Sequence, residues 1–151
     1  MRIWHFALLP YLPELQFKGQ LRELVAIMHD WRDKEKTNHL LINRVMEYPK
    51  SHLSIYYARY IKEYKKRNPY KFFEKTNGEF MRFGDINFGM FVNCEEFKPF
   101  KDWHNKEYLR VCLGNLYEKH VFGVGKSRIT DEEWQRLVDG YKQITGEDYK
   151  I

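Results

Sequence analysis

The sequence predicts a mainly α fold, a single-domain helical bundle with one long irregular, Phe-rich loop. Apolar side chains recur every three or four positions through most of the chain, which is the spacing of one helix face. Thr130 and Glu133 form a capping-box pattern, a signature of a helix start. With 151 residues, 43% of them hydrophobic, the chain is long enough to bury one core. We therefore expect one domain over residues 1–151, with its helical core over 1–68 and 103–146.

Two helices are expected in the first third of the chain. The first covers about residues 14–28, where leucine, valine and methionine side chains recur at helical spacing. The second starts at a cap formed by Thr37 or Asn38. It ends by Tyr48, because Pro49 follows and disfavours helical geometry in the residue before it.

A third helix is expected from Ser51 to the basic cluster Lys65, Lys66 and Arg67, with a broad face of leucine, isoleucine and tyrosine. Cations suit the C-terminal end of a helix because they oppose its dipole. The same three side chains are also suited to contact a phosphate backbone. A solvated helix end and a DNA-binding surface are both open interpretations of this cluster.

Residues 69–101 break the helical pattern. Phenylalanine and glycine alternate there without a regular period, so we expect an irregular insertion whose rings pack onto the helices. Helical spacing resumes near position 108, after a cap formed by Asp102 or Asn105. The last helix follows the capping box and is expected to stop at Gly146.

The charge and the residue types limit the possible partners. A formal net charge of +5 favours polyanions such as nucleic acid, because each neutralised phosphate releases counterions. The six histidines show no metal-ligand spacing and the two cysteines lie far apart, so we expect no metal and no cofactor. No membrane-length apolar run and no signal-peptide pattern is present. We expect a cytoplasmic protein with no membrane partner and no obligate protein partner.

The sequence begins MRIWH, with apolar residues directly after the first amine, although free termini normally fray. An α-amine has an ordinary pKa of about 7.7–8.0, so about a tenth of it is neutral and nucleophilic at pH 7. The stretch FKGQLREL, residues 17–24, places Lys18, Arg22 and Glu23 on the first helix. One interpretation is a solvated helix face. In the other, a rigid chain start brings a free amine within reach of the Glu23 carboxylate, an arrangement suited to Schiff-base chemistry.

The segments MRIWHFALLPYLP and GQLREL together resemble the pyrimidine-dimer DNA glycosylases, most clearly over residues 1–25. In that family of small helical glycosylases and abasic-site lyases, the N-terminal amine is the nucleophile and an Arg follows it directly. An Arg-Glu pair lies further along the chain. The resemblance implies that Met1 supplies the amine, that Glu23 assists it, and that Arg2 and Arg22 hold the DNA phosphates.

Further side chains complete the expected DNA-binding set. Lys18 shares a helix face with the arginine four residues later and is expected to contact the same phosphates. His5 is expected to stack at the distorted step of the DNA. The basic cluster of Lys65, Lys66 and Arg67 is expected to follow the backbone beyond it.

The expected function is therefore DNA repair, by a metal-independent DNA N-glycosylase with abasic-site lyase activity that acts on damaged double-stranded DNA. The resemblance implies that the amine attacks C1′ of the sugar and that Glu23 stabilises the positive charge that develops. A noncatalytic nucleic-acid-binding protein on the same helical scaffold is the alternative, because a shared fold does not guarantee shared chemistry. A protein-interaction module, with the Phe-rich loop as its contact surface, is a third hypothesis.

Overall fold

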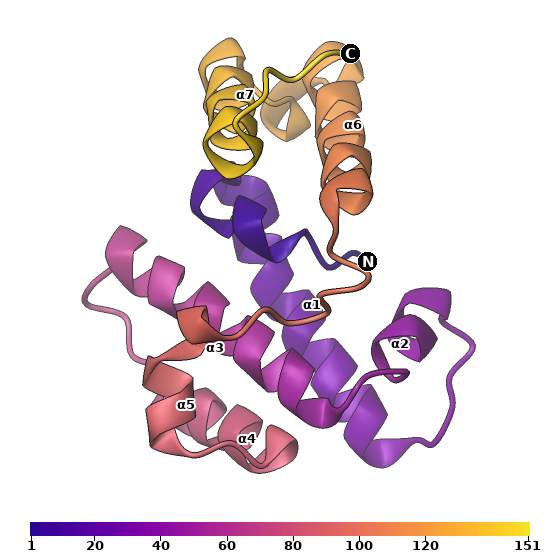
Figure 1. Cartoon of the computed structure of the whole chain (residues 1–151), viewed down its shortest axis with the longest axis vertical. Helices are drawn as coiled ribbons and strands as arrows, with labels where there is room; N and C mark the ends of the chain where they lie inside the picture. Colours follow the sequence, from indigo (N-terminus) through magenta and orange to yellow (C-terminus); the bar gives the residue numbers. More distant parts are fainter. The chain divides into compact units, whose positions relative to one another are not determined.

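The structure is a computed structural model that describes all residues, 1–151. It consists of α-helices and short 3₁₀-helices (η) without any strand, so the predicted mainly α fold is confirmed (Figure 1). None of the helices combines the length and the apolar composition needed to cross a bilayer. In chain order the elements are η1 (Phe6–Tyr11), α1 (Glu14–Asp33), α2 (Leu40–Val45), α3 (Lys50–Arg67), α4 (Glu74–Gly84), α5 (Phe88–Val92), η2 (Cys94–Glu96), α6 (Lys106–Phe122), η3 (Gly125–Ser127) and α7 (Asp131–Thr145).

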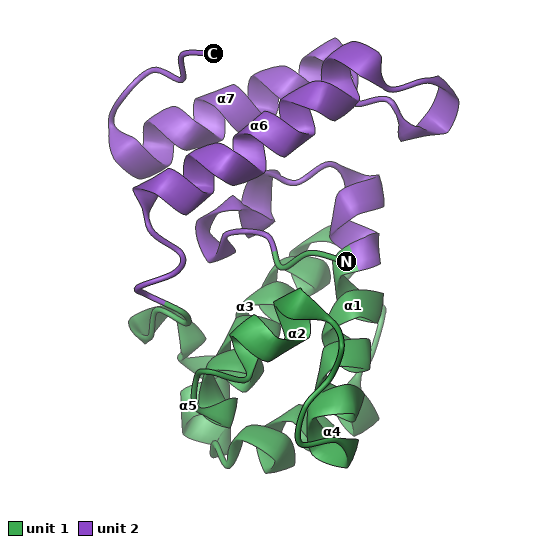
Figure 2. Cartoon of the chain, turned by 90° about the vertical axis from the view of Figure 1, so that its right-hand side faces the viewer, with its two compact units in different colours: residues 1–3, 20–100 green, residues 4–19, 101–151 purple.

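The chain divides into two compact units, which Figure 2 shows in different colours. Unit 1 consists of residues 1–3 and 20–100, and unit 2 of residues 4–19 and 101–151. The division falls inside α1, so that this helix begins in unit 2 and continues in unit 1. The organisation of the whole chain as a single domain stays a prediction.

Helix α3 is the centre of unit 1 and packs against α4, α5 and η2. Its buried face is aromatic, with Tyr56, Tyr57 and Tyr60 fully enclosed. The rings of Tyr57 and Phe80 stack with their centroids 3.9 Å apart and their planes only 4° from parallel. Large buried rings contribute much of the apolar stabilisation of a core, so α3 gives unit 1 a well-packed central helix.

The Phe-rich segment 69–101 is mostly helical, with α4, α5 and η2, and not the irregular insertion that the sequence predicted. The face of α4 that meets α3 contains Asn77, Phe80 and Gly84, spaced as one helix face. Asn77 Oδ1 accepts a 2.7 Å hydrogen bond from Tyr57, and a Cβ on Gly84 would lie 2.6 Å from the Cβ of a serine on α3. An amide, a ring and a glycine share this face, so no apolar stripe revealed the helix in the sequence.

Unit 2 is arranged around α7, which packs against α6 and η1. The closest approach is at Gly140, where an added Cβ would lie 2.5 Å from the ring of Tyr11. The guanidinium of Arg136 donates a 2.6 Å hydrogen bond to the carbonyl of Pro10. A glycine contact and a side-chain contact to the backbone therefore hold η1 against α7.

Several predicted helix ends are confirmed in unit 2. Thr130 and Glu133 make both hydrogen bonds of the capping box at the start of α7. Gly146 ends that helix with a left-handed φ of 76°, which glycine adopts without a steric penalty. Asn105, and not Asp102, caps α6, because its Oδ1 accepts the first-turn N–H of Tyr108 at 2.8 Å.

The predicted cap of α2 is wrong by one or two residues. His39 is the cap, and its Nδ1 accepts the N–H of Leu41 at 3.2 Å. The Thr37 hydroxyl accepts the N–H of His39 at 3.1 Å, so it is already used in the turn before the helix. Asn38, the other predicted cap, precedes that histidine and is exposed.

Candidate active site

The backbone of Arg2 is held by two side chains of α1, and Figure 2 shows the N-terminus beside this helix in unit 1. The Arg2 N–H donates to Glu23 Oε2 at 3.0 Å, and the Arg2 carbonyl accepts from Gln20 Nε2 at 2.9 Å. Ile3, the next residue, is fully buried. The start of the chain is therefore anchored from residue 2 onward, unlike an ordinary frayed terminus.

Gln20 connects this anchor to the core of unit 1. Its Nε2 also donates to Glu23 Oε2 at 3.4 Å, and its Oε1 accepts a 3.0 Å hydrogen bond from the Tyr56 hydroxyl. Because the Arg2 carbonyl can only accept a hydrogen bond, it must be the NH₂ group of the Gln20 amide, and not its oxygen, that faces the chain start. Gln20 and Tyr56 are both fully buried, so a satisfied polar network fixes the carboxylate and the Arg2 backbone together.

The α-amine of Met1 lies at the solvent edge of this network. Met1 is 51% exposed, and its amine takes part in no ion pair. Adjacent backbone nitrogens are less than about 3.8 Å apart, so the amine lies within about 7 Å of Glu23 Oε2. Glu23 Oε1 accepts no hydrogen bond from the protein. An exposed residue with an unpaired α-amine and a carboxylate with one available oxygen therefore lie at the same end of this network.

Two cations of α1 are exposed, and their expected contacts with DNA phosphates stay a prediction. Arg22 is exposed and forms no ion pair. Lys18 pairs with Glu14 at 3.5 Å, but both side chains are more than half exposed and such surface pairs contribute little. Each of these two cations is therefore available to a phosphate. The side chain of Arg2 is partly buried.

His5 is buried in unit 2, where its Nδ1 caps η1 by accepting the N–H of Ala7 at 3.1 Å. Nδ1 of His104 accepts the N–H of Phe6 at the same distance, and the two imidazoles stack 5.3 Å apart. Burial lowers the pKa of His5 to about 4 and that of His104 to about 2, because charged rings would lose their hydration. The structure shows a capping role for His5, and its expected DNA contact stays a prediction.

The basic cluster at the end of α3 contains two kinds of side chain. Lys65 and Lys66 are exposed and have no ion pair. Arg67 pairs with Glu63 at 3.1 Å, and these two side chains are only 17% and 11% exposed. The lysines therefore present their charge to solvent, whereas the arginine stabilises the helix that carries it.

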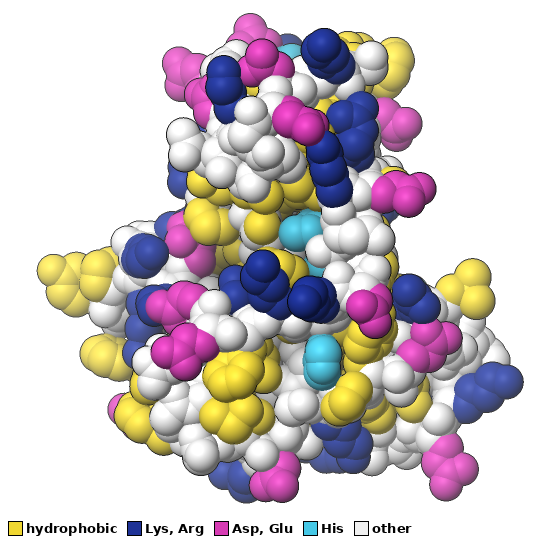
Figure 3. Space-filling model, viewed as in Figure 1, with side chains coloured by type: hydrophobic (Ala, Val, Ile, Leu, Met, Phe, Trp, Pro, Cys, Tyr) yellow, Lys and Arg dark blue, Asp and Glu magenta, His cyan; other side chains and the backbone are white.

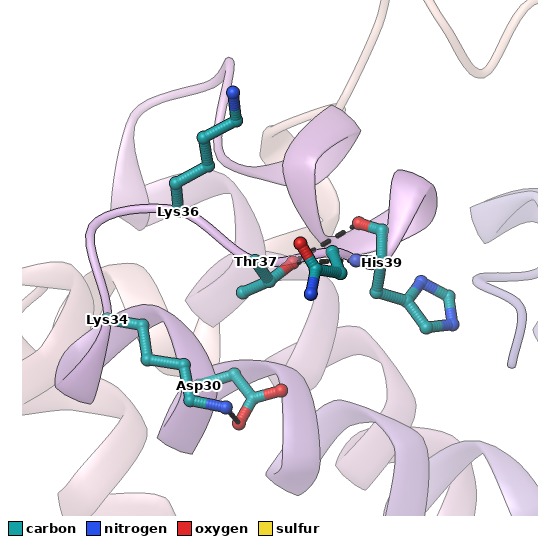
Figure 4. Close-up of a pocket in the computed structure, with 6 residues that line it drawn as sticks. Asp30, Lys34, Lys36, Thr37 and His39 are labelled. Atoms are coloured by element: carbon teal, nitrogen blue, oxygen red, sulfur yellow. Dashed lines mark hydrogen bonds and ion pairs between the residues drawn. The ribbon is translucent and has the colours of Figure 1, made fainter.

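An open depression lies at the end of α1 and in the loop after it (Figure 4). Lys34 is paired there with Asp30 at 3.5 Å, and Thr37 is hydrogen-bonded within the loop. Figure 4 shows that the side chains of Lys36 and His39 point away from each other. No set of side chains converges on this depression, so it is not the candidate site. No group of three His, Cys, Asp or Glu side chains is placed to hold a metal ion.

The sequence prediction named neither Gln20 nor Tyr56 as a site residue. Gln20 precedes Glu23 by three positions, which places the two side chains on one face of α1. This spacing was the available signal for the glutamine. Tyr56 gave none, because it lies among several tyrosines on a buried face of α3.

A family model described as pyrimidine dimer DNA glycosylase matches residues 1–77, which is just over half of the 151 residues. No curated protein and no solved structure matches the chain. The matched segment runs from the anchored chain start through α1, α2 and α3 and into α4, so it contains the whole hydrogen-bond network around Glu23. Helices α6 and α7 lie beyond it. The chain belongs to the pyrimidine dimer DNA glycosylase family, which makes it a DNA repair glycosylase with DNA as its substrate.

Proposed function

We propose that this glycosylase excises a damaged base and then cleaves the strand, with the Met1 amine as nucleophile and Glu23 as the assisting carboxylate. The observation that carries this assignment is the 3.0 Å hydrogen bond from the Arg2 N–H to Glu23 Oε2. It supports the assignment because it keeps residue 1 next to the carboxylate while Met1 stays exposed. The proposed substrate is damaged double-stranded DNA, and the proposed location is the cytoplasm.

Base excision begins when the amine nitrogen of Met1 donates its lone pair to C1′ of the sugar. The bond from C1′ to the base breaks, and the base leaves with the electron pair and takes up a proton. Opening of the sugar ring and loss of an amine proton then give a protonated imine between Met1 and C1′. The positive charge of this imine lies near Glu23, whose available Oε1 stabilises it electrostatically.

Strand cleavage follows from the imine, because it makes the hydrogens on C2′ acidic. Removal of one such proton lets the C3′–O bond break, and the oxygen leaves with its electron pair on the phosphate. Glu23 is the proposed carrier of this proton. Water then hydrolyses the imine and restores the amine of Met1. The proposed sequence of steps uses no metal and no cofactor.

The cations near the chain start are proposed to hold the DNA. Arg22 and Lys18 are exposed on α1, and Arg2 follows the nucleophile directly. Contacts to phosphates position a nucleic acid without reading its sequence. A nucleotide must leave the base stack before C1′ can meet the amine, and phosphate contacts on both sides favour that rotation.

Gln20 and Tyr56 are proposed to be positioning residues and not catalytic ones. Gln20 holds the Arg2 carbonyl and Glu23 Oε2 at once, and Tyr56 holds Gln20. All three bonds are buried or partly buried, where loss of a partner costs about 1–3 kcal/mol. The relay thus holds the Arg2 backbone against the carboxylate and keeps the amine one residue away from it, which favours a reaction between groups already close together.

The experiment that tests the proposal is reductive trapping. The protein is mixed with DNA that carries one abasic site, and borohydride is added to reduce any imine to a stable amine. We expect a covalent adduct whose cross-linked peptide begins at Met1. Acetylation of the α-amine, or a tag fused before it, should abolish the adduct, while the same tag at the C-terminus should leave it unchanged.

Two results would overturn the proposal. An adduct mapped to a lysine side chain would show that another amine reacts. DNA binding without any adduct would select the noncatalytic nucleic-acid-binding protein that the sequence left as the alternative. Binding is therefore measured on the same samples, by fluorescence anisotropy of labelled abasic DNA.

A further inference from the structure

The turn between α3 and α4 exposes two aromatic rings among lysines. Tyr70 is 88% exposed and Phe72 is 75% exposed, which is unusual for such large rings. In Figure 3, hydrophobic side chains project at the left edge, where Figure 1 places this turn, and basic side chains lie close by. We call Lys65, Lys66, Tyr70, Lys71 and Phe72 the turn surface.

This exposure is built into the turn and does not result from a loose chain. The N–H of Asn68 donates to the Tyr64 carbonyl at 2.8 Å, and the N–H of Lys71 donates to the Asn68 carbonyl at 3.3 Å. The ring of Phe73 packs edge-on against Tyr64 with centroids 4.9 Å apart. The residues on both sides of the exposed rings are therefore fixed, and the rings point outward from an ordered backbone.

The charge around these rings is mainly positive: three lysines lie within the turn surface, and one exposed acid, Glu74, follows it at the start of α4. Lys65, Lys66 and Lys71 are exposed, and none of them takes part in an ion pair. The nearest acid on α3, Glu63, is already neutralised by Arg67 at 3.1 Å. The turn surface therefore offers three free cations and two flat apolar faces within eight residues of sequence.

Another exposed ring of unit 1 has charged neighbours that are mainly of the opposite sign. Phe88 at the start of α5 is 68% exposed, so it resembles the two rings in accessibility. Within eight positions of it along the chain lie three acids, Asp85, Glu95 and Glu96, and a single cation, Arg82. Exposure of an aromatic ring alone does not select a polyanion, whereas exposure among free lysines does.

We propose that the turn surface binds single-stranded nucleic acid, with Tyr70 and Phe72 stacking on unpaired bases and the lysines contacting the phosphates between them. Base faces are covered in a duplex and accessible in a single strand, so exposed rings beside free cations fit the single strand. Every base has such a face, so we expect little sequence preference. This contact is additional to the excision chemistry and does not depend on the amine.

The test measures the affinity for a fluorescently labelled single-stranded DNA of mixed sequence, at several salt concentrations. We expect the double variant Tyr70→Ala/Phe72→Ala to weaken binding by at least about 5- to 150-fold, the range for loss of one stacked base. The matched control Phe88→Ala should bind as the unmodified protein does. Replacement of Lys65 and Lys66 by alanine should weaken binding and reduce its salt dependence.

A second measurement tests stacking directly in the unmodified protein, so that the inference can be tested even if a variant does not fold. The unmodified protein is titrated with single-stranded DNA that carries the fluorescent base 2-aminopurine, whose emission falls when it stacks on a ring. We expect quenching with the full chain and none after Tyr70 and Phe72 are replaced. Unchanged circular dichroism and unchanged thermal unfolding establish that the variant is folded.

Three results would overturn the inference. Equal single-strand affinity of the double variant and the unmodified protein would show that the rings make no contact. Loss of duplex binding alone would assign the surface to the duplex backbone. Binding to vesicles of anionic lipid, without single-strand binding, would identify a membrane surface instead. Acetylation of Met1 leaves the expected single-strand affinity unchanged, so failure here and failure of the amine chemistry are distinguishable.

Discussion

Both compact units hold the backbone of the N-terminal segment with polar side chains, but only in unit 2 are all of these side chains buried. In unit 1, Gln20 and Glu23 hold Arg2, and the network ends at an exposed amine and an available carboxylate oxygen. In unit 2, His5 and His104 hold the amides of η1, and both rings are buried and stacked. We call these the open network and the closed network.

This difference shows that polar side chains that hold a backbone segment can serve either stability or reactivity. A closed network stabilises the fold, because the Nδ1 atoms of its two rings accept backbone N–H groups and the rings remain uncharged. An open network can also do chemistry, because one of its ends stays accessible to a ligand. Changes to the closed network should therefore alter unfolding, and changes to the open network should alter reactivity more than unfolding.

The largest effect is expected for Glu23→Gln. The amide retains an oxygen for the Arg2 N–H but loses the negative charge that stabilises the imine. We expect strand cleavage of abasic DNA to fall by about 10²- to 10⁴-fold, with nearly unchanged DNA affinity. Glu14→Gln, on the exposed first turn of α1, is the matched control and should cleave normally. Parallel loss of affinity and cleavage in Glu23→Gln would indicate a structural role for this carboxylate.

The closed network should make the protein less stable in mild acid. His5 and His104 have pKa values of about 4 and about 2 in the folded chain, and near 6.5 when unfolded. Between pH 6.5 and pH 4 the unfolded chain therefore binds more protons, so this stabilisation is complete above about pH 6.5 and is lost as the pH falls. We expect the free energy of unfolding to drop by about 2–4 kcal/mol from pH 7 to pH 5.

Urea unfolding at the two pH values measures this loss. His5→Asn preserves a capping acceptor and does not titrate, so the loss should shrink by about half in that variant. An unchanged loss in His5→Asn would show that other groups cause the acid sensitivity.

Substitutions of closely packed glycines allow the stability of the two units to be compared without changing a residue of either network. Alanine at Gly84 in unit 1, or at Gly140 in unit 2, would collide with a packed neighbour. We expect each substitution to cost about 1–3 kcal/mol of unfolding free energy. Gly114→Ala in α6 meets no atom within 4 Å and should be neutral or slightly stabilising.

Hydrogen exchange on the same variants tests the predicted single domain. If the chain unfolds as one domain, Gly84→Ala should lower amide protection in both units by the same free energy. Loss of protection confined to residues 1–3 and 20–100 would contradict the single-domain prediction.

The smallest effect is expected for Tyr56→Phe, compared with Tyr57→Phe on the next position of α3. Both hydroxyls are buried and donate to a side-chain amide oxygen, at Gln20 and at Asn77. Each change should cost about 0.5–1.5 kcal/mol of stability. Only Tyr56→Phe should also slow borohydride trapping, by about 2- to 10-fold. Equal trapping rates in the two variants would show that Tyr56 does not position the open network.

The sequence was a good guide where the interactions are local. The capping box of α7 and the stop at Gly146 depend on residues three or four positions apart, and both were predicted. The sequence did not predict helix α4, because the residues on its buried face are explained only by their contacts with α3. Gly84 lies close to a serine of α3, and Asn77 binds a tyrosine of α3.

The same reasoning applies to the candidate site. Met1, Arg22 and Glu23 were named from their order and from the family resemblance, and the structure anchors Arg2 at Glu23. Tyr56 lies 36 positions from its partner Gln20, so no local pattern could connect them. His5 was expected at the DNA, because a sequence does not show which imidazoles a fold encloses.

The amide at position 20 has a consequence for sequence variation. It accepts one hydrogen bond and donates two, and only asparagine and glutamine side chains offer those groups together. Asparagine is one methylene shorter, so little else can occupy this place without breaking a buried bond. A glutamine three positions before the glutamate, combined with a distant tyrosine, is therefore a signature by which genes encoding the same arrangement can be found.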